Sequence, residues 1–291
     1  MSQLSDVLAS GKFVFTCELN PPKGTDLQSL ISKADRLSES ITAFNITDSA
    51  GSNMAMAPIG VARILAEKHI EPILQVTCRD RNRIALQAEL LAASALDLSN
   101  VLCMSGDPPG GGDHPDAKAV FDIDAIGLLH AIQAMNSGKD LSGNEMKGDT
   151  NLFPGAVVNP GSPDIDKELS RMEDKIKAGA AFFQSQGIYE PHMFEKFMNG
   201  ARAFGIPILA GIIVLKSANM ARYLNSNLPG VYVPDDIVNE LESSQDRSAT
   251  SIEIAGRTIS EIRSMCEGVH IMAIGWESRI PKMIEAAGLR T

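Results

Sequence analysis

The stretch VLCMSGDPP, residues 101–109, decides how the rest of the sequence is interpreted. Its first four residues are apolar and predict a short buried strand. Gly106 lets the chain turn, and Pro108 and Pro109 exclude both strand and helix beyond it. Asp107 therefore stands at the end of a strand, in front of a rigid loop. There it either caps the turn or faces a ligand.

Seven further runs are similar, and most of them are continuously apolar. Strands have this composition when helices cover both faces of their sheet. The eight runs are FVFTCEL (13–19), AFNITD (43–48), PILQVTC (72–78), VLCMSGD (101–107), PGAVVN (154–159), AFFQSQ (181–186), PILAGIIVL (207–215) and VHIMAI (269–274). The segments between them show helical spacing of apolar residues, as at Leu27, Leu30, Ile31, Ala34 and Leu37.

Eight strand–helix units predict a (β/α)8 barrel that forms a single domain over residues 1–291. The alternative is a doubly wound open sheet. The barrel is favoured because the count is eight and no Gly-x-Gly-x-x-Gly turn follows the first run. A long polar segment at residues 224–250 interrupts the pattern. We expect this segment to be an insertion with its own short helix that covers one end of the barrel.

Composition excludes several classes of function. The formal net charge of −10 disfavours nucleic acid or an anionic membrane as the main partner. No apolar stretch reaches the roughly 18–20 residues that span a bilayer, and the N-terminus lacks the features of a signal peptide. A cytoplasmic protein is therefore expected. The four cysteines form no Cys-x-x-Cys pair and predict buried free thiols, and the histidines show no metal-ligand spacing.

Polar residues follow the predicted strands where they end, which is where the chemistry of a barrel is located. Each of them also has an ordinary structural interpretation, such as a solvated charge, a turn cap or a loop hydrogen bond. Because they should converge on one face, a binding site is the stronger interpretation. A carboxyl buried there, with a raised pKa, would act as a proton donor. The main members of this ring are Glu18, Thr47, Gln75, Asp107, Gln186 and Arg279.

Five segments resemble the methylenetetrahydrofolate reductase family in order and spacing, from about residue 12 to residue 290. They are FTCELNPPKGTD, NITDSAGSN, LQVTCRD, VLCMSGDPP and KAGAAFFQSQGIYE. The pairing of Glu-x-x-Pro-Pro with Gly-Asp-x-Pro is the most specific part. The resemblance implies a (β/α)8 barrel that binds a flavin at its strand ends. It also implies the reduction of methylenetetrahydrofolate to methyltetrahydrofolate in one-carbon metabolism.

The resemblance also implies roles for individual residues. Glu18 corresponds to the general acid that protonates a folate nitrogen. Asp107 corresponds to the aspartate beside flavin and folate, Gln186 to the glutamine that contacts the pterin, and Arg279 to an arginine near the substrate. The implied flavin contacts are Thr47, Gln75, Ser105, Gly106, Asp107, Phe121, Val157, Glu168 and Lys175.

Several positions depart from the family pattern. Ser105 stands where the family has an arginine, and Gln75 stands where it has a histidine. Residues 157–164 replace a Tyr-Pro-Glu-x-His-Pro-Glu loop. Ala218 replaces an aromatic residue that stacks on substrate and nicotinamide. We therefore expect FAD, with FMN as the alternative. The expected electron donor is NADH or NADPH, with a partner electron-transfer subunit as the alternative, and a barrel that only binds folate is a third reading. The resemblance also implies a homo-oligomer.

Overall fold

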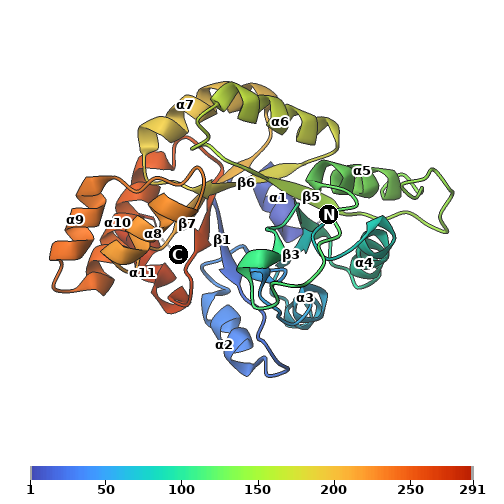
Figure 1. Cartoon of the computed structure of the whole chain (residues 1–291), viewed down its shortest axis with the longest axis horizontal. Helices are drawn as coiled ribbons and strands as arrows, with labels where there is room; N and C mark the ends of the chain where they lie inside the picture. The colour runs from blue at the N-terminus through green and yellow to red at the C-terminus, as the bar shows by residue number, and fades with distance from the viewer. Residues whose placement is uncertain (1, 290–291) are drawn as a thin grey trace.

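The structure is a computed structural model that describes residues 2–289. Within this range, eight parallel strands close into a barrel in the order β1 to β8 (Figure 1). The prediction of a (β/α)8 barrel is therefore confirmed, and the open sheet is excluded by the pairing of β1 with β8. Met1, Arg290 and Thr291, which the predicted domain includes, lie outside the described residues.

Every strand overlaps one of the eight apolar runs. The strands are β1 (Val14–Leu19), β2 (Ala43–Ile46), β3 (Pro72–Thr77), β4 (Asn100–Met104), β5 (Phe153–Val158), β6 (Phe182–Gly187), β7 (Ile208–Ile213) and β8 (Gly268–Met272). Several runs were predicted to extend further at their carboxyl ends. The ladder stops before the polar residues there, such as Asp48 and Asp107, so these lie in loops.

Helices surround the barrel and alternate with its strands (Figure 1). Several begin with a side chain that accepts a bond from a free backbone N–H, as Asn82 does for α4 and Asp124 does for α5. The helices are α1 (Gln3–Ala9), α2 (Gln28–Leu37), α3 (Pro58–Ala66), α4 (Arg83–Ala95), α5 (Ala125–Met135), α6 (Ile165–Lys177), α7 (Pro191–Ala201), α8 (Ala218–Asn227), α9 (Asp235–Ser243), α10 (Arg247–Ile262) and α11 (Ile280–Ala286).

The barrel interior is apolar at one end. Its buried side chains there form one cluster with Leu4 and Leu8 of α1, which closes the amino ends of the strands. Phe182 reaches into this layer because its neighbour on β5 is Gly155, where a Cβ would lie 2.3 Å from the ring. The strand members of the layer are Val14, Ala43, Ile73, Leu102, Phe182 and Leu209. This floor leaves the carboxyl ends of the strands for polar groups.

Residues 224–250 contain the end of α8, all of α9 and the start of α10. Helix α9 packs against α8 and α10 at the outer edge of the molecule (Figure 1). Its residues Ile237 and Leu241 belong to a cluster with Leu224 and Ile254. The loop before α9 reaches the barrel rim, where Asn159 Nδ2 donates to the Pro229 carbonyl over 3.2 Å. That this segment covers a barrel end stays a prediction.

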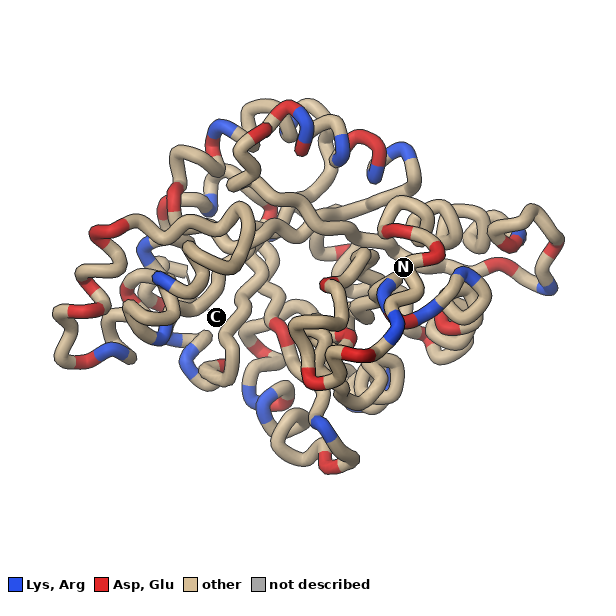
Figure 2. The backbone as a smooth tube through the Cα atoms, in the orientation of Figure 1, with Lys and Arg blue, Asp and Glu red and all other residues tan. Residues whose placement is uncertain are grey.

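Charged residues of both signs are interspersed along the surrounding helices and loops (Figure 2). Among the described residues, no helix is long and apolar enough to cross a membrane. All four cysteines are free and buried, as predicted. Burial raises the pKa of the Cys78 thiol to about 11 and that of Cys266 to about 12. All four thiols pack within the main hydrophobic core.

Candidate active site

A cleft of about 560 Å³ opens at the carboxyl ends of the barrel strands. Its volume lies within the range of small-molecule and cofactor sites. The closed barrel brings together side chains that are far apart in the sequence. Nine of the residues that the sequence predicted for the site line this cleft: Glu18, Gln75, Ser105, Gly106, Asp107, Val157, Glu168, Lys175 and Gln186.

Three predicted site residues are not part of this lining. Thr47 is buried, and its hydroxyl donates to Asn20 Oδ1 over 2.8 Å. Phe121 lies in the loop after β4 with its side chain 40% exposed. The Arg279 guanidinium lies 4.2 Å from the centre of the Trp276 ring. Ligand roles for these three residues stay predictions.

Glu18 lies near the end of β1, and one group from β3 and one from β8 face its carboxylate. Gln75 Nε2 donates to Glu18 Oε1 over 3.2 Å, and His270 Nε2 lies 3.6 Å from the same oxygen. Burial raises the pKa of the Glu18 carboxyl, but the interactions with His270 and Gln75 outweigh burial and leave that pKa below its ordinary value. The expectation of a raised pKa was therefore wrong, because it considered burial and not the two donors.

His270 was missed because a single histidine in the apolar run VHIMAI shows no motif. It is 3% exposed and lies on β8, which pairs with β1 so that Thr16 and His270 are register partners. Inward-facing residues alternate along a strand, so Glu18, two residues after Thr16, lies on the same face. The informative signal was a histidine within the strand that closes the barrel.

The turn after β4 carries Ser105, Gly106 and Asp107 into the cleft. Gly106 has φ +88°, and a Cβ there would lie 3.1 Å from the Cβ atoms of Thr77 and Arg79. Glycine is therefore required both by the backbone conformation and by the close approach of β3. Arg79, 3% exposed, lines the cleft beside this turn. The sequence analysis missed this cation, which lies near the position where Ser105 replaces the family arginine.

We expect Gly106→Ala to lower the free energy of unfolding by about 1–3 kcal/mol, the usual cost of a strained backbone position. Gly110→Ala is the matched control, because a Cβ at Gly110 meets nothing within 4 Å and its φ is not positive. Urea unfolding of both variants measures the difference. Equal stability of the two variants would contradict the requirement for glycine at residue 106.

Helix α6 supplies another part of the cleft wall. Glu168 Oε1 accepts the Asn159 backbone N–H over 2.9 Å, and Lys175 Nζ donates to the Val157 carbonyl over 2.6 Å. Burial lowers the pKa of the Lys175 ammonium. Both side chains thus tie α6 to the end of β5, and Arg171 of the same helix also lines the cleft.

Comparison with known proteins identifies the family. The profile described as "Methylenetetrahydrofolate reductase" matches residues 3–288. The chain belongs to the methylenetetrahydrofolate reductase family. It is 24% identical over 310 residues to "Methylenetetrahydrofolate reductase 2" of Schizosaccharomyces pombe, which covers 99% of this chain and 47% of that protein. It is 27% identical over 255 residues to "Probable methylenetetrahydrofolate reductase (NADH)" of Oryza sativa subsp. japonica, with 84% and 42% covered.

This chain therefore spans less than half the length of these two methylenetetrahydrofolate reductases. Among solved structures, it resembles a Clostridium thermocellum protein described as binding two copies of 5-methyl-5,6,7,8-tetrahydrofolic acid. The TM-score is 0.59 at 15% identity, and the match covers 98% of this chain and 97% of the other. At this identity the likeness shows the shared barrel fold.

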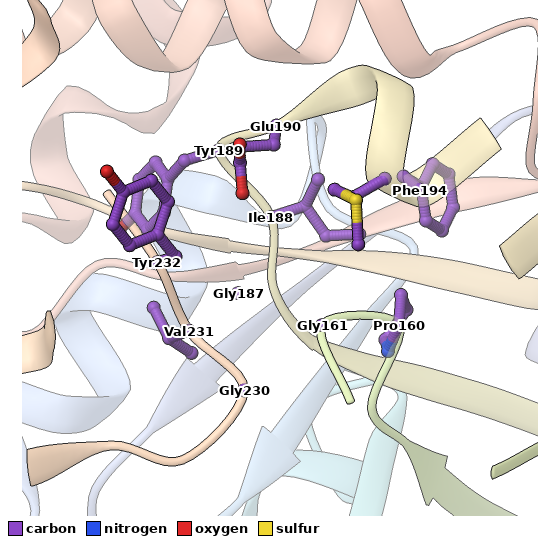
Figure 3. A pocket seen from close by; sticks show the side chains of 11 residues that line it. Pro160, Gly161, Gly187, Ile188, Tyr189, Glu190, Phe194, Gly230, Val231 and Tyr232 are labelled. Atoms are coloured by element: carbon purple, nitrogen blue, oxygen red, sulfur yellow. The ribbon is translucent and has the colours of Figure 1, made fainter. Parts of the chain in front are cut away.

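A second, smaller cavity of about 190 Å³ in this methylenetetrahydrofolate reductase family member is lined by the loops after β5 and β6, the start of α7 and the loop before α9. Its wall includes Ile188, Glu190 and Phe194 on one side and Tyr232 on the other (Figure 3). Two of the loops that line it approach each other closely at Gly161 and Gly230. A Cβ on Gly161 would lie 1.9 Å from the Gly230 carbonyl oxygen, so this approach requires glycine. The sequence analysis did not predict this cavity.

Proposed function

We propose that this chain reduces 5,10-methylenetetrahydrofolate to 5-methyltetrahydrofolate in a flavin-dependent reaction. The observation that carries the proposal is the convergence of Glu18, Asp107 and Gln186, from three separate strands or strand ends, on one cleft. Membership of the methylenetetrahydrofolate reductase family supports the same reaction. That the protein acts in the cytoplasm as a homo-oligomer remains a prediction from the sequence.

The cleft fits a flavin. Glycine at residue 106 lets the turn after β4 approach Thr77 and Arg79 closely, and these three residues together line the part of the cleft proposed to hold the flavin ring. Arg171 of the cleft lining is the cation proposed for a phosphate group, because the Arg79 guanidinium pairs with Asp80 and Lys175 Nζ donates to the Val157 carbonyl. A bound flavin would supply the hydride for the reduction. We propose FAD as the cofactor, with FMN as the alternative because Ser105 and Gln75 depart from the family pattern.

The remaining chemistry belongs to three side chains. Glu18 protonates a folate nitrogen, so that the bond from this nitrogen to the methylene carbon breaks and leaves an iminium that accepts hydride. The negative charge of Asp107 favours this cationic form of the folate. Gln186 Oε1 accepts the N–H of Gly187 over 3.1 Å, which leaves the amide NH₂ group of Gln186 to donate to the pterin.

NADH or NADPH is the proposed electron donor, and plant and nematode relatives are named with NADH and NADPH respectively. A partner electron-transfer subunit is the second candidate. Ala218 favours it, because this residue stands where the family has an aromatic side chain and lies buried in the cluster beneath α8.

The visible spectrum of the purified chain tests the proposal directly. We expect a yellow protein whose flavin absorbance bleaches with NADH in the absence of oxygen and returns when methylenetetrahydrofolate is added. In a second outcome, the flavin stays oxidised with NADH, yet bleaches with a chemical reductant and recolours when the folate is added. That result would assign electron delivery to a partner. A protein that stays colourless after incubation with FAD and with FMN would contradict the flavin-dependent reaction.

A further inference from the structure

A chain of buried polar side chains crosses the barrel interior just above its apolar floor. Asn45 and Gln184 exchange two hydrogen bonds, of 2.7 and 3.0 Å, between their amide groups. Gln184 Nε2 also lies 3.4 Å from Thr16 Oγ1, which in turn lies 2.9 Å from His270 Nδ1. All four side chains are at most 3% exposed. The chain ends at Glu18, on the wall of the cleft.

The distances give this chain a direction. Because Gln184 donates to the Thr16 oxygen, the Thr16 hydroxyl proton must go to another acceptor. His270 Nδ1 at 2.9 Å is a better acceptor than the Val269 carbonyl at 3.5 Å. A neutral His270 then carries its proton on Nε2, which faces the Glu18 carboxylate. The reverse direction would place an unprotonated Nε2 against a carboxylate oxygen, where two lone pairs repel.

The side chains of His270 and Gln75 both face the same carboxylate oxygen of Glu18, Oε1. His270 Nε2 lies 3.6 Å from Oε1, and Gln75 Nε2 donates to Oε1 over 3.2 Å. Among the described residues, no protein group donates a hydrogen bond to the other oxygen, Oε2. Oε2 is also not one of the fully buried polar atoms that lack a partner. Oε1 already accepts from Gln75 and has the His270 ring beside it, so it is a poor site for a further proton. Oε2 is therefore the oxygen that takes up a proton.

We infer that His270 is a positioning residue that, together with Gln75, occupies Glu18 Oε1, so that the acidic proton resides on Oε2 and faces the cleft. Thr16 and Gln184 set the tautomer of His270 that makes this possible. The inference rests on the proposed function, because it specifies which oxygen of Glu18 protonates the folate. The proton moves from Oε2 to the folate nitrogen, and the carboxylate that remains keeps the Gln75 hydrogen bond and the His270 ring at Oε1.

Other titratable groups also face the cleft. Asp48, Arg79, Asp107 and Asp124 come from the loops after β2, β3 and β4, and Glu168, Arg171 and Lys175 come from α6. The contacts that lower the pKa of Glu18 come from β8 and β3, through His270 and Gln75. Variants of His270 therefore change one of the two contacts that lower the pKa of Glu18 and leave the other charged groups of the cleft in place.

Nitrogen NMR of the flavin-incubated protein tests the inference without any turnover. The His270 signal is assigned by its loss in His270→Gln. We expect the neutral Nε2–H tautomer, and either an Nδ1–H tautomer or an imidazolium protonated on both nitrogens would overturn the inference. Since this measurement needs no folate reduction, it decides the inference even if the proposed function fails.

The pH profile of the folate-dependent step is the second test. The rate should fall at high pH, where Glu18 loses its proton. In His270→Leu we expect this fall to occur at higher pH, because the carboxylate no longer has the His270 N–H beside it. The rate on the low-pH plateau should fall on the order of 10²-fold, because the acid is no longer held in place. His270→Gln keeps an N–H donor and should retain both the pH of this fall and most of the rate. If both variants change equally, with wild-type urea stability, His270 only fills space and the inference is overturned.

Discussion

Glu18→Gln is expected to slow folate reduction by about 10²–10⁴-fold, the usual contribution of a general acid. The amide is close in size to the carboxyl and can still accept from Gln75, so the cleft should keep its shape. Flavin binding and reduction by NADH should remain near wild type, because the proposed cofactor contacts lie on other strands. Stopped-flow measurement of the two half-reactions separates these effects, since only the step with methylenetetrahydrofolate should slow.

Glu195→Gln provides the control for this experiment. Glu195 lies exposed on α7, so the same change of charge occurs away from the cleft. Both half-reactions should be unchanged in this variant. Wild-type folate reduction in Glu18→Gln would show that another group donates the proton.

The lowered pKa of Glu18 also has a consequence for stability. A carboxyl whose pKa is lower in the folded state stabilises the fold at pH values above its unfolded pKa. This contribution is lost as the pH falls through the folded pKa. The stability difference between wild type and Glu18→Gln should therefore shrink in acid, as urea unfolding across that range would measure.

The barrel could be predicted because its strands are buried on both faces and therefore form eight apolar runs. The ends of those strands were harder to place. Asp48 and Asp107 continue a run by sequence, but both residues lie beyond the last strand position, where the backbone ladder has ended. Asp48, for example, accepts from the backbone N–H and the hydroxyl of Thr77 on the next strand.

Contacts that depend on barrel closure could not be predicted from sequence spacing. His270 faces Glu18 because β8 pairs with β1, although 252 positions separate the two residues in the chain. Arg79 lies beside Gly106 because β3 pairs with β4, and the motif Gly-Asp-x-Pro gives no indication of that neighbour. Arg279 donates from Nε to Ser248 Oγ of α10 over 2.6 Å, a contact that sequence spacing also could not indicate.

Asp48→Ala is expected to lower the free energy of unfolding by about 3–5 kcal/mol, the usual cost of removing one partner of a buried ion pair. Asp48 is 8% exposed, and its Oδ2 accepts from Thr77 N and Thr77 Oγ1, each over 2.8 Å, and from Arg81. Truncation leaves the N–H at the end of β3 without its acceptor. Arg81 would lose its closest carboxylate, and its Nε already has no partner.

Two further variants separate charge from hydrogen bonding at this position. Asp48→Asn keeps an oxygen that can accept from Thr77 and loses only the charge, so its loss of stability should be smaller than that of Asp48→Ala. Glu67→Ala removes an exposed ion pair with Arg63 and should cost only about 0.3–0.5 kcal/mol. Urea unfolding of the three variants gives the order. If Asp48→Ala were as stable as Glu67→Ala, the contacts of Asp48 with Thr77 and Arg81 would not contribute to stability.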